Sequence, residues 1–155
     1  MSEDLIISNE AKDALLSCEL FTDVTEEQIR EVAALVEEID LAPGEVLLRA
    51  GDPAQYLFVV IKGRGVAQLE MDRGLLSLGL IGPHDTAGWA ALIQGQIYPA
   101  SVRALTAMRV ARLEAEALSV LMGLNRTVGY KVQKRLSTVF YRQYQAALET
   151  FRKTG

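Results

Sequence analysis

The stretch that decides the fold runs from Gly82 to Val102. It reads Gly-Pro-His-Asp-Thr-Ala-Gly-Trp-Ala-Ala-Leu over residues 82–92 and, after a five-residue spacer, Tyr-Pro-Ala-Ser-Val over residues 98–102. Gly88 precedes a short apolar run, which predicts a helical turn that begins at this glycine. The free backbone N–H groups and the dipole of such a turn attract an anion. A phosphate there would need the glycine for close approach and a cation to neutralise its charge.

Outward from this stretch, short apolar runs alternate with turns over residues 38–114. Turn signals such as Pro43-Gly44, Lys62-Gly63 and Gly82-Pro83 separate runs that are rich in β-branched residues. Short strands at a spacing of roughly ten residues are typical of an antiparallel sandwich or roll. The candidate strands cover residues 46–48, 56–61, 66–69, 75–81, 100–105 and 108–113.

Helical periodicity flanks the β region on both sides. Thr25 followed by Gln28 makes a capping box, and the apolar spacing from Ile29 to Ile39 predicts a helix that continues to residue 39. Two more helices are predicted after Glu114, the second of them long. We therefore expect one domain over residues 1–155, with helices in 9–39, a β-roll in 38–114 and helices in 115–151.

The composition indicates a compact soluble protein. Half of the 155 residues are hydrophobic, and the net charge of −4 argues against a surface built for nucleic acid or anionic lipid. Cys18 is the only cysteine, so no internal disulfide can form, and we expect a buried thiol. The acidic N-terminus does not suit a signal peptide, and the apolar runs are too short to cross a bilayer. We expect a cytoplasmic protein without membrane insertion.

Further segments occur in a recognisable order. Leu16–Phe21 and Glu27–Val32 precede the β region, Pro43–Leu47 begins it, and Tyr56–Gly63 continues it. Together with the stretch from Gly82 to Ala104, their order and spacing resemble the cyclic-nucleotide-binding domain of catabolite-activator-type regulators, kinase regulatory subunits and gated channels. The resemblance implies a mainly β fold with flanking helices, an antiparallel double-stranded β-helix or jelly roll with N-terminal helices and a long C-terminal helix.

The resemblance also implies a phosphate-binding cassette that has lost its two ligand-binding side chains. In the family, a glutamate binds the ribose 2′-hydroxyl and an arginine pairs with the cyclic phosphate. Trp89 stands at the glutamate position, Tyr98 at the arginine position, and Pro99 replaces a hydroxyl residue. Hydrogen bonds to charged groups contribute about 1.5 to 3 kcal/mol each. Losing two of them would weaken binding by roughly 3 to 6 kcal/mol, or about two to four decades. The altered site would consist of Gly88, Trp89, Ala90, Ala91, Tyr98, Pro99, Ala100 and Ser101.

The two aromatic residues in the cassette have two interpretations. They can collapse into the vacated pocket and fill it, which we expect, or form a stacking platform for a flat ligand. Arg49, Arg64 and Arg103 are candidates to replace the lost cation, although a structural role is the simpler interpretation. His84 is interpreted as a turn residue with an unusual backbone angle.

The long C-terminal helix is the candidate dimer element. Val132, Leu136, Val139 and Gln143 fall on the spacing of a two-helix seam. Gln143 and Tyr144 stand where the family's last helix closes over the base. The alternative is that the helix packs on its own roll. Few residues follow Phe151, which leaves no room for the winged helix of DNA-binding relatives, so we expect no direct DNA binding.

These observations leave two functions. The first is a stand-alone regulatory module that binds cAMP or cGMP weakly or not at all and acts through protein–protein contact, as a homodimer with an unknown protein partner. The second is a true sensor of a cyclic nucleotide or another small ligand, with an altered pocket, that signals to a separate partner. No catalytic residues, metal ligands or cofactor are expected, because one histidine and one cysteine supply no metal cluster or catalytic set.

Overall fold

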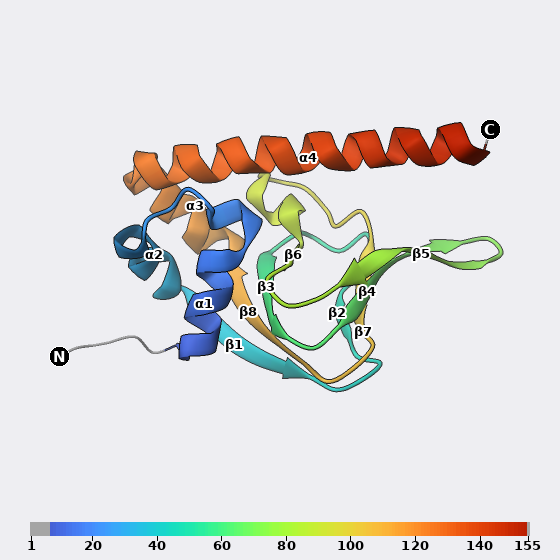
Figure 1. The fold of residues 1–155 in the computed structure, drawn as a ribbon, viewed down its shortest axis with the longest axis horizontal. Helices are drawn as coiled ribbons and strands as arrows, with labels where there is room; N and C mark the ends of the chain where they lie inside the picture. Colours follow the sequence, from blue (N-terminus) through green and yellow to red (C-terminus); the bar gives the residue numbers. More distant parts are fainter. Residues whose placement is uncertain (1–6, 155) are drawn as a thin grey trace.

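The computed structural model describes residues 7–154, and its centre is a roll of two antiparallel sheets (Figure 1). One sheet has the strand order β1-β8-β3-β6 and the other the order β2-β7-β4-β5. This is the predicted jelly roll, with helices before it and a long helix after it. The strands are β1 (Val36–Leu41), β2 (Val46–Leu48), β3 (Tyr56–Lys62), β4 (Gly65–Met71), β5 (Gly74–Ile81), β6 (Thr86–Ala87), β7 (Ser101–Ala104) and β8 (Met108–Glu114).

Helices cover one side of the first sheet. The predicted capping box at the start of α2 is present, because Thr25 Oγ1 accepts from the N–H of Gln28 and Gln28 Oε1 accepts from the N–H of Thr25. The helical elements are α1 (Asn9–Ser17), the 3₁₀ turn η1 (Glu19–Phe21), α2 (Glu26–Ala33), the 3₁₀ turn η2 (Trp89–Leu92), α3 (Ala115–Leu124) and α4 (Arg126–Thr154).

Strand β3 separates two hydrophobic cores. Leu57, Val59 and Ile61 point to the helices, whereas Phe58 and Val60 point into the roll. Side chains alternate across a strand, and both faces of this one are buried. That explains why the run from Tyr56 to Ile61 is apolar throughout rather than alternating with polar residues.

The prediction of a helix as far as residue 39 is wrong. Helix α2 ends at Ala33, and residues 36–41 form β1, which pairs antiparallel with β8. The register places Glu37 opposite Arg112 and Asp40 opposite Arg109, and both pairs form ion pairs. The pairing with β8 therefore overrides the helical spacing of the apolar residues.

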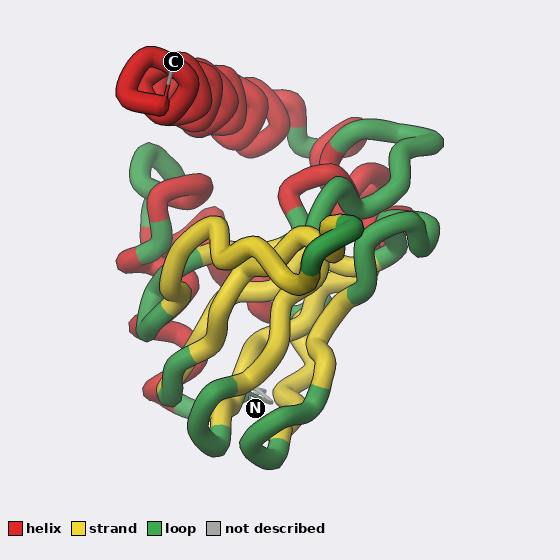
Figure 2. Tube along the Cα trace, turned by 90° about the vertical axis from the view of Figure 1, so that its right-hand side faces the viewer, coloured by secondary structure: helices red, strands yellow, loops and turns green. Residues whose placement is uncertain are grey.

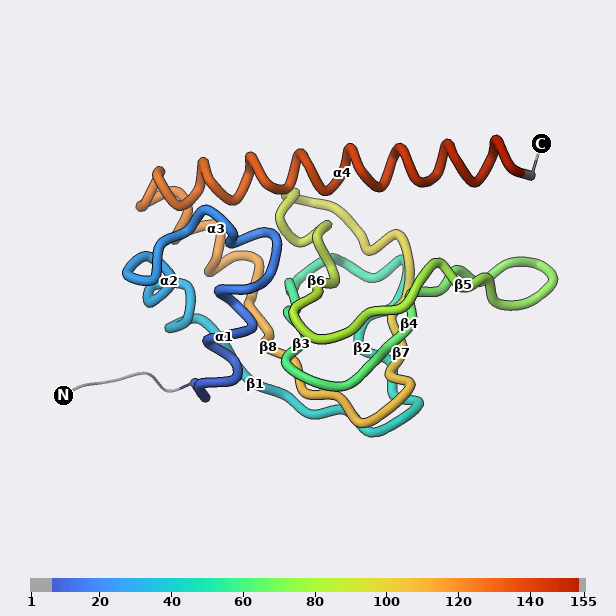
Figure 3. Tube along the Cα trace, viewed as in Figure 1, coloured from blue at the N-terminus to red at the C-terminus, as the bar shows by residue number. Residues whose placement is uncertain are grey.

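Helix α4 lies across the helical side of the molecule and extends past the roll (Figures 1 and 2). The β4–β5 hairpin protrudes at the same end as the C-terminal part of α4 (Figure 3). No helix within residues 7–154 is long and apolar enough to cross a membrane.

Candidate functional site

The turn at Gly88 has the backbone shape that the sequence predicts. Gly88 follows β6, has a left-handed φ of +81° and begins η2. A Cβ atom at this position would lie 2.8 Å from the carbonyl oxygen of Tyr56 and 3.1 Å from the ring of Tyr98. Only glycine fits, because both the backbone angle and the contact exclude a side chain.

The ring of Tyr98 lies inside the roll, beside Gly88. It is 5% exposed and packs in the core between the two sheets with Leu48, Phe58 and Val102. Its hydroxyl donates to the carbonyl oxygen of Tyr56 at 2.6 Å and accepts from the N–H of the same residue at 3.0 Å. Burial raises the pKa of this phenol, so the ring stays neutral. Tyr98 therefore occupies the interior with its polar group satisfied.

Trp89 points the other way. It packs against the core on the helical side, with its ring edge-to-face with Phe140 of α4 at a centroid distance of 6.0 Å. Its indole N–H donates to Thr86 Oγ1 at 3.1 Å. We expected both rings to fill the vacated pocket inside the roll. The ring of Tyr98 lies there, whereas the ring of Trp89 does not. Successive residues of η2 point to different sides: Ala90 packs toward the roll, whereas Trp89 and Ala91 pack toward the helices.

The remaining cassette residues supply no charge to the interior. The hydroxyl of Ser101 accepts from the N–H of Ala50 at 2.9 Å, which holds the preceding loop, while Pro99 is exposed and Ala100 is half-buried. Arg103, one of the three candidate cations, donates to the carbonyl oxygen of Gly44 at 2.9 Å. His84 has a φ of +75°, which confirms its interpretation as a turn residue.

The family profile described as "Cyclic nucleotide-binding domain" matches residues 38–125, more than half of the chain. The chain belongs to the cyclic nucleotide-binding domain family. A cyclic nucleotide-binding domain from Methylobacillus flagellatus superposes with a TM-score of 0.80 at 22% identity, covering 94% of this chain and 83% of that one. The N-terminal domain of a transcriptional regulator from Streptomyces coelicolor gives a TM-score of 0.75 at 25% identity, over 86% and 96% of the two chains.

Two further relatives are longer proteins, of which this chain matches only a part. A regulatory subunit of a cAMP-independent protein kinase A from Trypanosoma brucei, in a triple mutant bound to cAMP, has a TM-score of 0.72 at 18% identity, over 88% of this chain and 49% of that one. An uncharacterized NTE family protein of Mycobacterium tuberculosis is 28% identical over 113 residues, or 73% of this chain. The match spans only 19% of that relative's length.

Helix α4 of this cyclic nucleotide-binding domain is docked on its own chain. Val132, Leu136 and Val139, three residues of the expected dimer seam, are at most 5% exposed and belong to the core on the helical side. They cannot also contact a second copy, so the predicted seam is wrong. Gln143 and Tyr144, the expected lid residues, are exposed, whereas Phe140 of α4 contacts Trp89 of the cassette.

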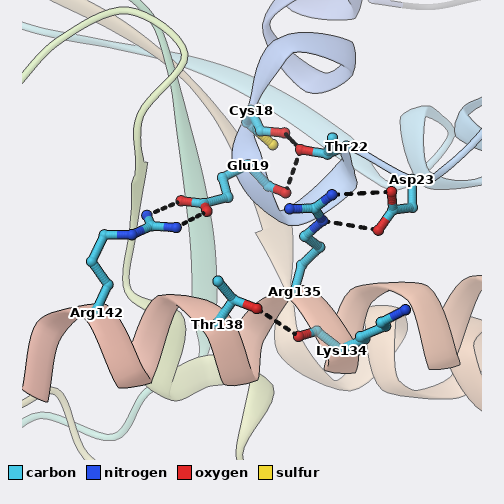
Figure 4. A network of polar contacts seen from close by, with 8 residues as sticks. All are labelled: Cys18, Glu19, Thr22, Asp23, Lys134, Arg135, Thr138 and Arg142. Atoms are coloured by element: carbon cyan, nitrogen blue, oxygen red, sulfur yellow. Dashed lines mark hydrogen bonds and ion pairs between the residues drawn. The ribbon is translucent and has the colours of Figure 1, made fainter.

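Two arginine–carboxylate pairs fasten α4 to the turn around η1 (Figure 4). Arg135 binds Asp23 through two hydrogen bonds of 2.8 and 3.2 Å, and Arg142 binds both carboxylate oxygens of Glu19. Hydrogen bonds from these guanidinium groups lower the pKa of Glu19 and of Asp23. Beneath them, burial raises the pKa of the Cys18 thiol to about 12, so this cysteine is the inert buried thiol that we expected.

Sequence reasoning missed the partners of the cassette. Tyr56 acts through its backbone, which leaves no signal in the sequence. The docking of α4 did leave one, because residues 1–45 contain thirteen acidic and two basic residues whereas residues 126–155 contain one acidic and seven basic residues. Within the described chain, no three His, Cys, Asp or Glu side chains are placed to hold a metal ion.

Proposed function

We propose that this domain is a non-catalytic regulatory module that binds cAMP and cGMP weakly or not at all and acts through protein–protein contact. The position of Tyr98 carries this proposal. A nucleotide phosphate beside Gly88 would have to displace a ring that is 5% exposed, and Tyr56 would lose both hydrogen bonds to the hydroxyl. Each buried group left unpaired costs about 1 to 3 kcal/mol.

The missing cation supports the same proposal. A cyclic phosphate keeps its charge when bound, and a buried charge needs a partner. The cassette residues from Gly88 to Ser101 contain no basic side chain, and the guanidinium of Arg103 is bonded to Gly44. A phosphate in this site would therefore find no basic side chain among the cassette residues.

The contact between Trp89 and Phe140 supports a constitutive arrangement. It joins the cassette directly to α4 without a ligand between them. The ion pairs of Arg135 and Arg142 hold the same helix to the N-terminal segment. We propose that α4 stays docked in this arrangement in the absence of a nucleotide and presents a fixed surface to a protein partner.

The remaining expectations belong to this proposal. They are a homodimer through the C-terminal helix, an unknown protein partner in the cytoplasm, and no direct contact with DNA. No cofactor is proposed. The alternative, a sensor that signals through an altered pocket, makes the opposite prediction for nucleotide binding and is separated from the proposal by experiment.

The experiment restores the two side chains that the family uses. In Tyr98→Arg with Trp89→Glu, the first change opens the interior and supplies a cation, and the second restores the family's carboxylate and removes the ring that contacts Phe140. We expect cAMP or cGMP to raise the melting temperature of the double variant and leave that of the wild type unchanged. The gain in affinity should be about two to four decades.

Tyr98→Leu is the matched control, because it opens the same space without supplying a cation. Neither nucleotide should raise its melting temperature. Stabilisation of the wild type by either nucleotide would contradict the proposal and favour the sensor. A silent but folded double variant would show that the loss of binding does not depend on these two side chains.

A further inference from the structure

Strand β5 lies at one edge of the second sheet, and its outer side has no partner strand. It pairs with β4 on the other side, and within residues 7–154 no further backbone hydrogen bond reaches residues 74–81. The β4–β5 hairpin protrudes from the roll, so this edge is accessible (Figure 1). An edge of this kind presents unpaired N–H and C=O groups that can bind another strand.

The three other edge strands of the described sheets are charged or short, as is usual for edges that stay unpaired. Strand β1 carries Glu37, Glu38 and Asp40, whereas β2 and β6 have three and two residues. Strand β5 has eight residues and reads Gly-Leu-Leu-Ser-Leu-Gly-Leu-Ile, without a charge or a proline. Four of its side chains are between 47% and 65% exposed: Leu75, Leu76, Leu78 and Leu80. An edge with these properties is typical of strand pairing.

The turn of the hairpin decides which backbone groups of β5 point outward. Met71 pairs with Gly74 across a two-residue loop, and a loop this short is closed by a hydrogen-bonded pair. Hydrogen-bonded and non-hydrogen-bonded pairs alternate along an antiparallel ladder. Leu76 therefore bonds to β4, whereas Leu75 and Ser77 direct their N–H and C=O groups to the free edge. The register shifts after Ser77, which ends this regular stretch.

We propose that residues 75–77 of β5 pair antiparallel with the same residues of a second copy of this chain, about a two-fold axis at Leu76. This register places Leu75 opposite Ser77 of the second copy, so both outward-facing residues form hydrogen-bonded pairs. Leu76 then faces its own counterpart in a non-hydrogen-bonded pair, in which side chains lie closest.

The pairing uses both faces of β5. Leu76 lies opposite Leu69 of β4 and Leu75 opposite Glu70, and successive side chains of a strand point to opposite faces. A surface that docks on one face of the hairpin would cover only one of the two leucines. A strand added at the edge gives each of them a neighbour on its own face.

A second copy supplies the strand that this edge requires, because β5 is itself extended, apolar and uncharged. Pairing with β1 of another copy would place leucines beside three carboxylates, and such an unequal contact would continue from copy to copy. A two-fold axis uses the same edge twice and closes the dimer. The inference rests on the homodimer of the proposed function but places the contact on β5 instead of on α4.

Sedimentation of the full chain at concentrations from 1 to about 100 μM tests the pairing. The wild type should approach twice the 17.0 kDa of one chain. Ser77→Pro removes an N–H that β4 does not use, and Leu76→Lys places like charges opposite each other at the axis. Each should raise the dissociation constant at least about tenfold and keep the wild-type circular dichroism. Val120→Lys is the matched control, because it adds the same charge to an exposed apolar residue of α3, and it should dimerise as the wild type does.

Cross-linking tests the register. Cys18 is the only cysteine and is buried, so a cysteine introduced on β5 reacts without background. Leu76→Cys should form a disulfide-linked dimer under mild oxidation, because the two residues at the axis lie within bridging distance. Leu75→Cys is the control, since it is more exposed than Leu76 but would lie diagonally across from its counterpart, about 7 to 8 Å away.

Three results would overturn the pairing: a monomeric wild type, a dimer that Ser77→Pro and Leu76→Lys leave unchanged, or Leu75→Cys cross-linking as fast as Leu76→Cys. The second of these would place the contact elsewhere on the chain. None of them affects the nucleotide claim, which is measured separately by ligand titration.

Discussion

The ring of Tyr98 and the missing side chain of Gly88 depend on each other. The ring lies where a Cβ at residue 88 would reach, 3.1 Å away, and the carbonyl of Tyr56 closes the remaining space at 2.8 Å. The same carbonyl accepts the hydrogen bond from Tyr98. A glycine that the family needs for close approach of a phosphate is kept here for close approach of a tyrosine.

Replacing Gly88 by alanine should lower the free energy of unfolding by about 2 to 4 kcal/mol. The positive φ costs about 1 to 2 kcal/mol for any L-residue, and the contact with Tyr56 adds strain. Gly95→Ala is the control, since Gly95 has a φ of +79° but open space around it, and it should lose only the first part. Urea unfolding measures both, and equal losses would contradict the close contact.

Replacing Tyr98 by phenylalanine tests the hydrogen bonds separately from the ring. The N–H and carbonyl of Tyr56 would lose their partner in the interior, so we expect a loss of about 1 to 3 kcal/mol. Tyr141→Phe removes a hydroxyl from a residue that is 62% exposed and should change stability by less than about 0.5 kcal/mol. Similar urea midpoints for the two variants would argue against a hydrogen-bonded Tyr98.

At the scale of elements, the position of α4 is set by one apolar row and two ion pairs. Val128, Val132 and Leu136 bury the row against the helical side, while Arg135 and Arg142 reach across to the turn around η1 (Figure 4). The distal part of the helix has no such row, since residues 141–153 are all exposed. The first half of α4 is therefore docked on the chain's own core, and its second half is exposed to solvent.

The ion pairs make the docking of α4 depend on pH. The folded state lowers the pKa of Glu19 and of Asp23, so their contribution is complete above the ordinary carboxyl values of about 4. It is lost as the pH falls through the lowered native values. Trp89 is the only tryptophan and contacts α4, so its emission should shift to the red as acid releases the helix.

The variant Glu19→Gln with Asp23→Asn should weaken this pH dependence. It should be less stable than the wild type at neutral pH and converge with it in acid. Glu116→Gln, on the exposed surface of α3, serves as the control. A double variant with the wild-type acid transition, followed by the Trp89 emission, would contradict a docking role for the two pairs.

Introducing glutamate at Leu136 tests whether this residue lies in the chain's own core or in a dimer seam. Leu136 is 3% exposed in the chain's own core, so Leu136→Glu should cost at least about 4 kcal/mol and leave little folded protein. Gln143→Glu, two turns further along an exposed part of the helix, should be neutral within about 0.5 kcal/mol. A folded monomer from Leu136→Glu, seen by circular dichroism and sedimentation, would restore the original seam.

The local signals in the sequence predicted most elements but not the direction in which side chains point. The strands from β2 to β5, β7 and β8 and the capping box follow from turns and apolar runs. The strand β1 could not be predicted, because its charged residues acquire partners only when β8 lies beside it. In the cassette, the sequence does not show where the two aromatic rings point, because only the backbone of η2 decides that Trp89 turns outward.

At the scale of the whole molecule, the interior of the roll is filled and the outer surface carries exposed apolar side chains. The ring of Tyr98 occupies the interior of the roll, and large apolar side chains are exposed on the distal part of α4 and on the β4–β5 hairpin. A cyclic nucleotide-binding domain built in this way has no space for a ligand beside Tyr98, but its outer apolar surface is open to contact with another protein. This arrangement suits a module that communicates by contact rather than by ligand capture.

Calorimetric titration of the wild-type chain with cAMP and with cGMP is the most direct test of this account. Because Tyr98 fills the interior and no basic side chain lies in the cassette, we predict no measurable heat of binding at nucleotide concentrations up to about 100 μM. A dissociation constant in the low micromolar range for either nucleotide would contradict it.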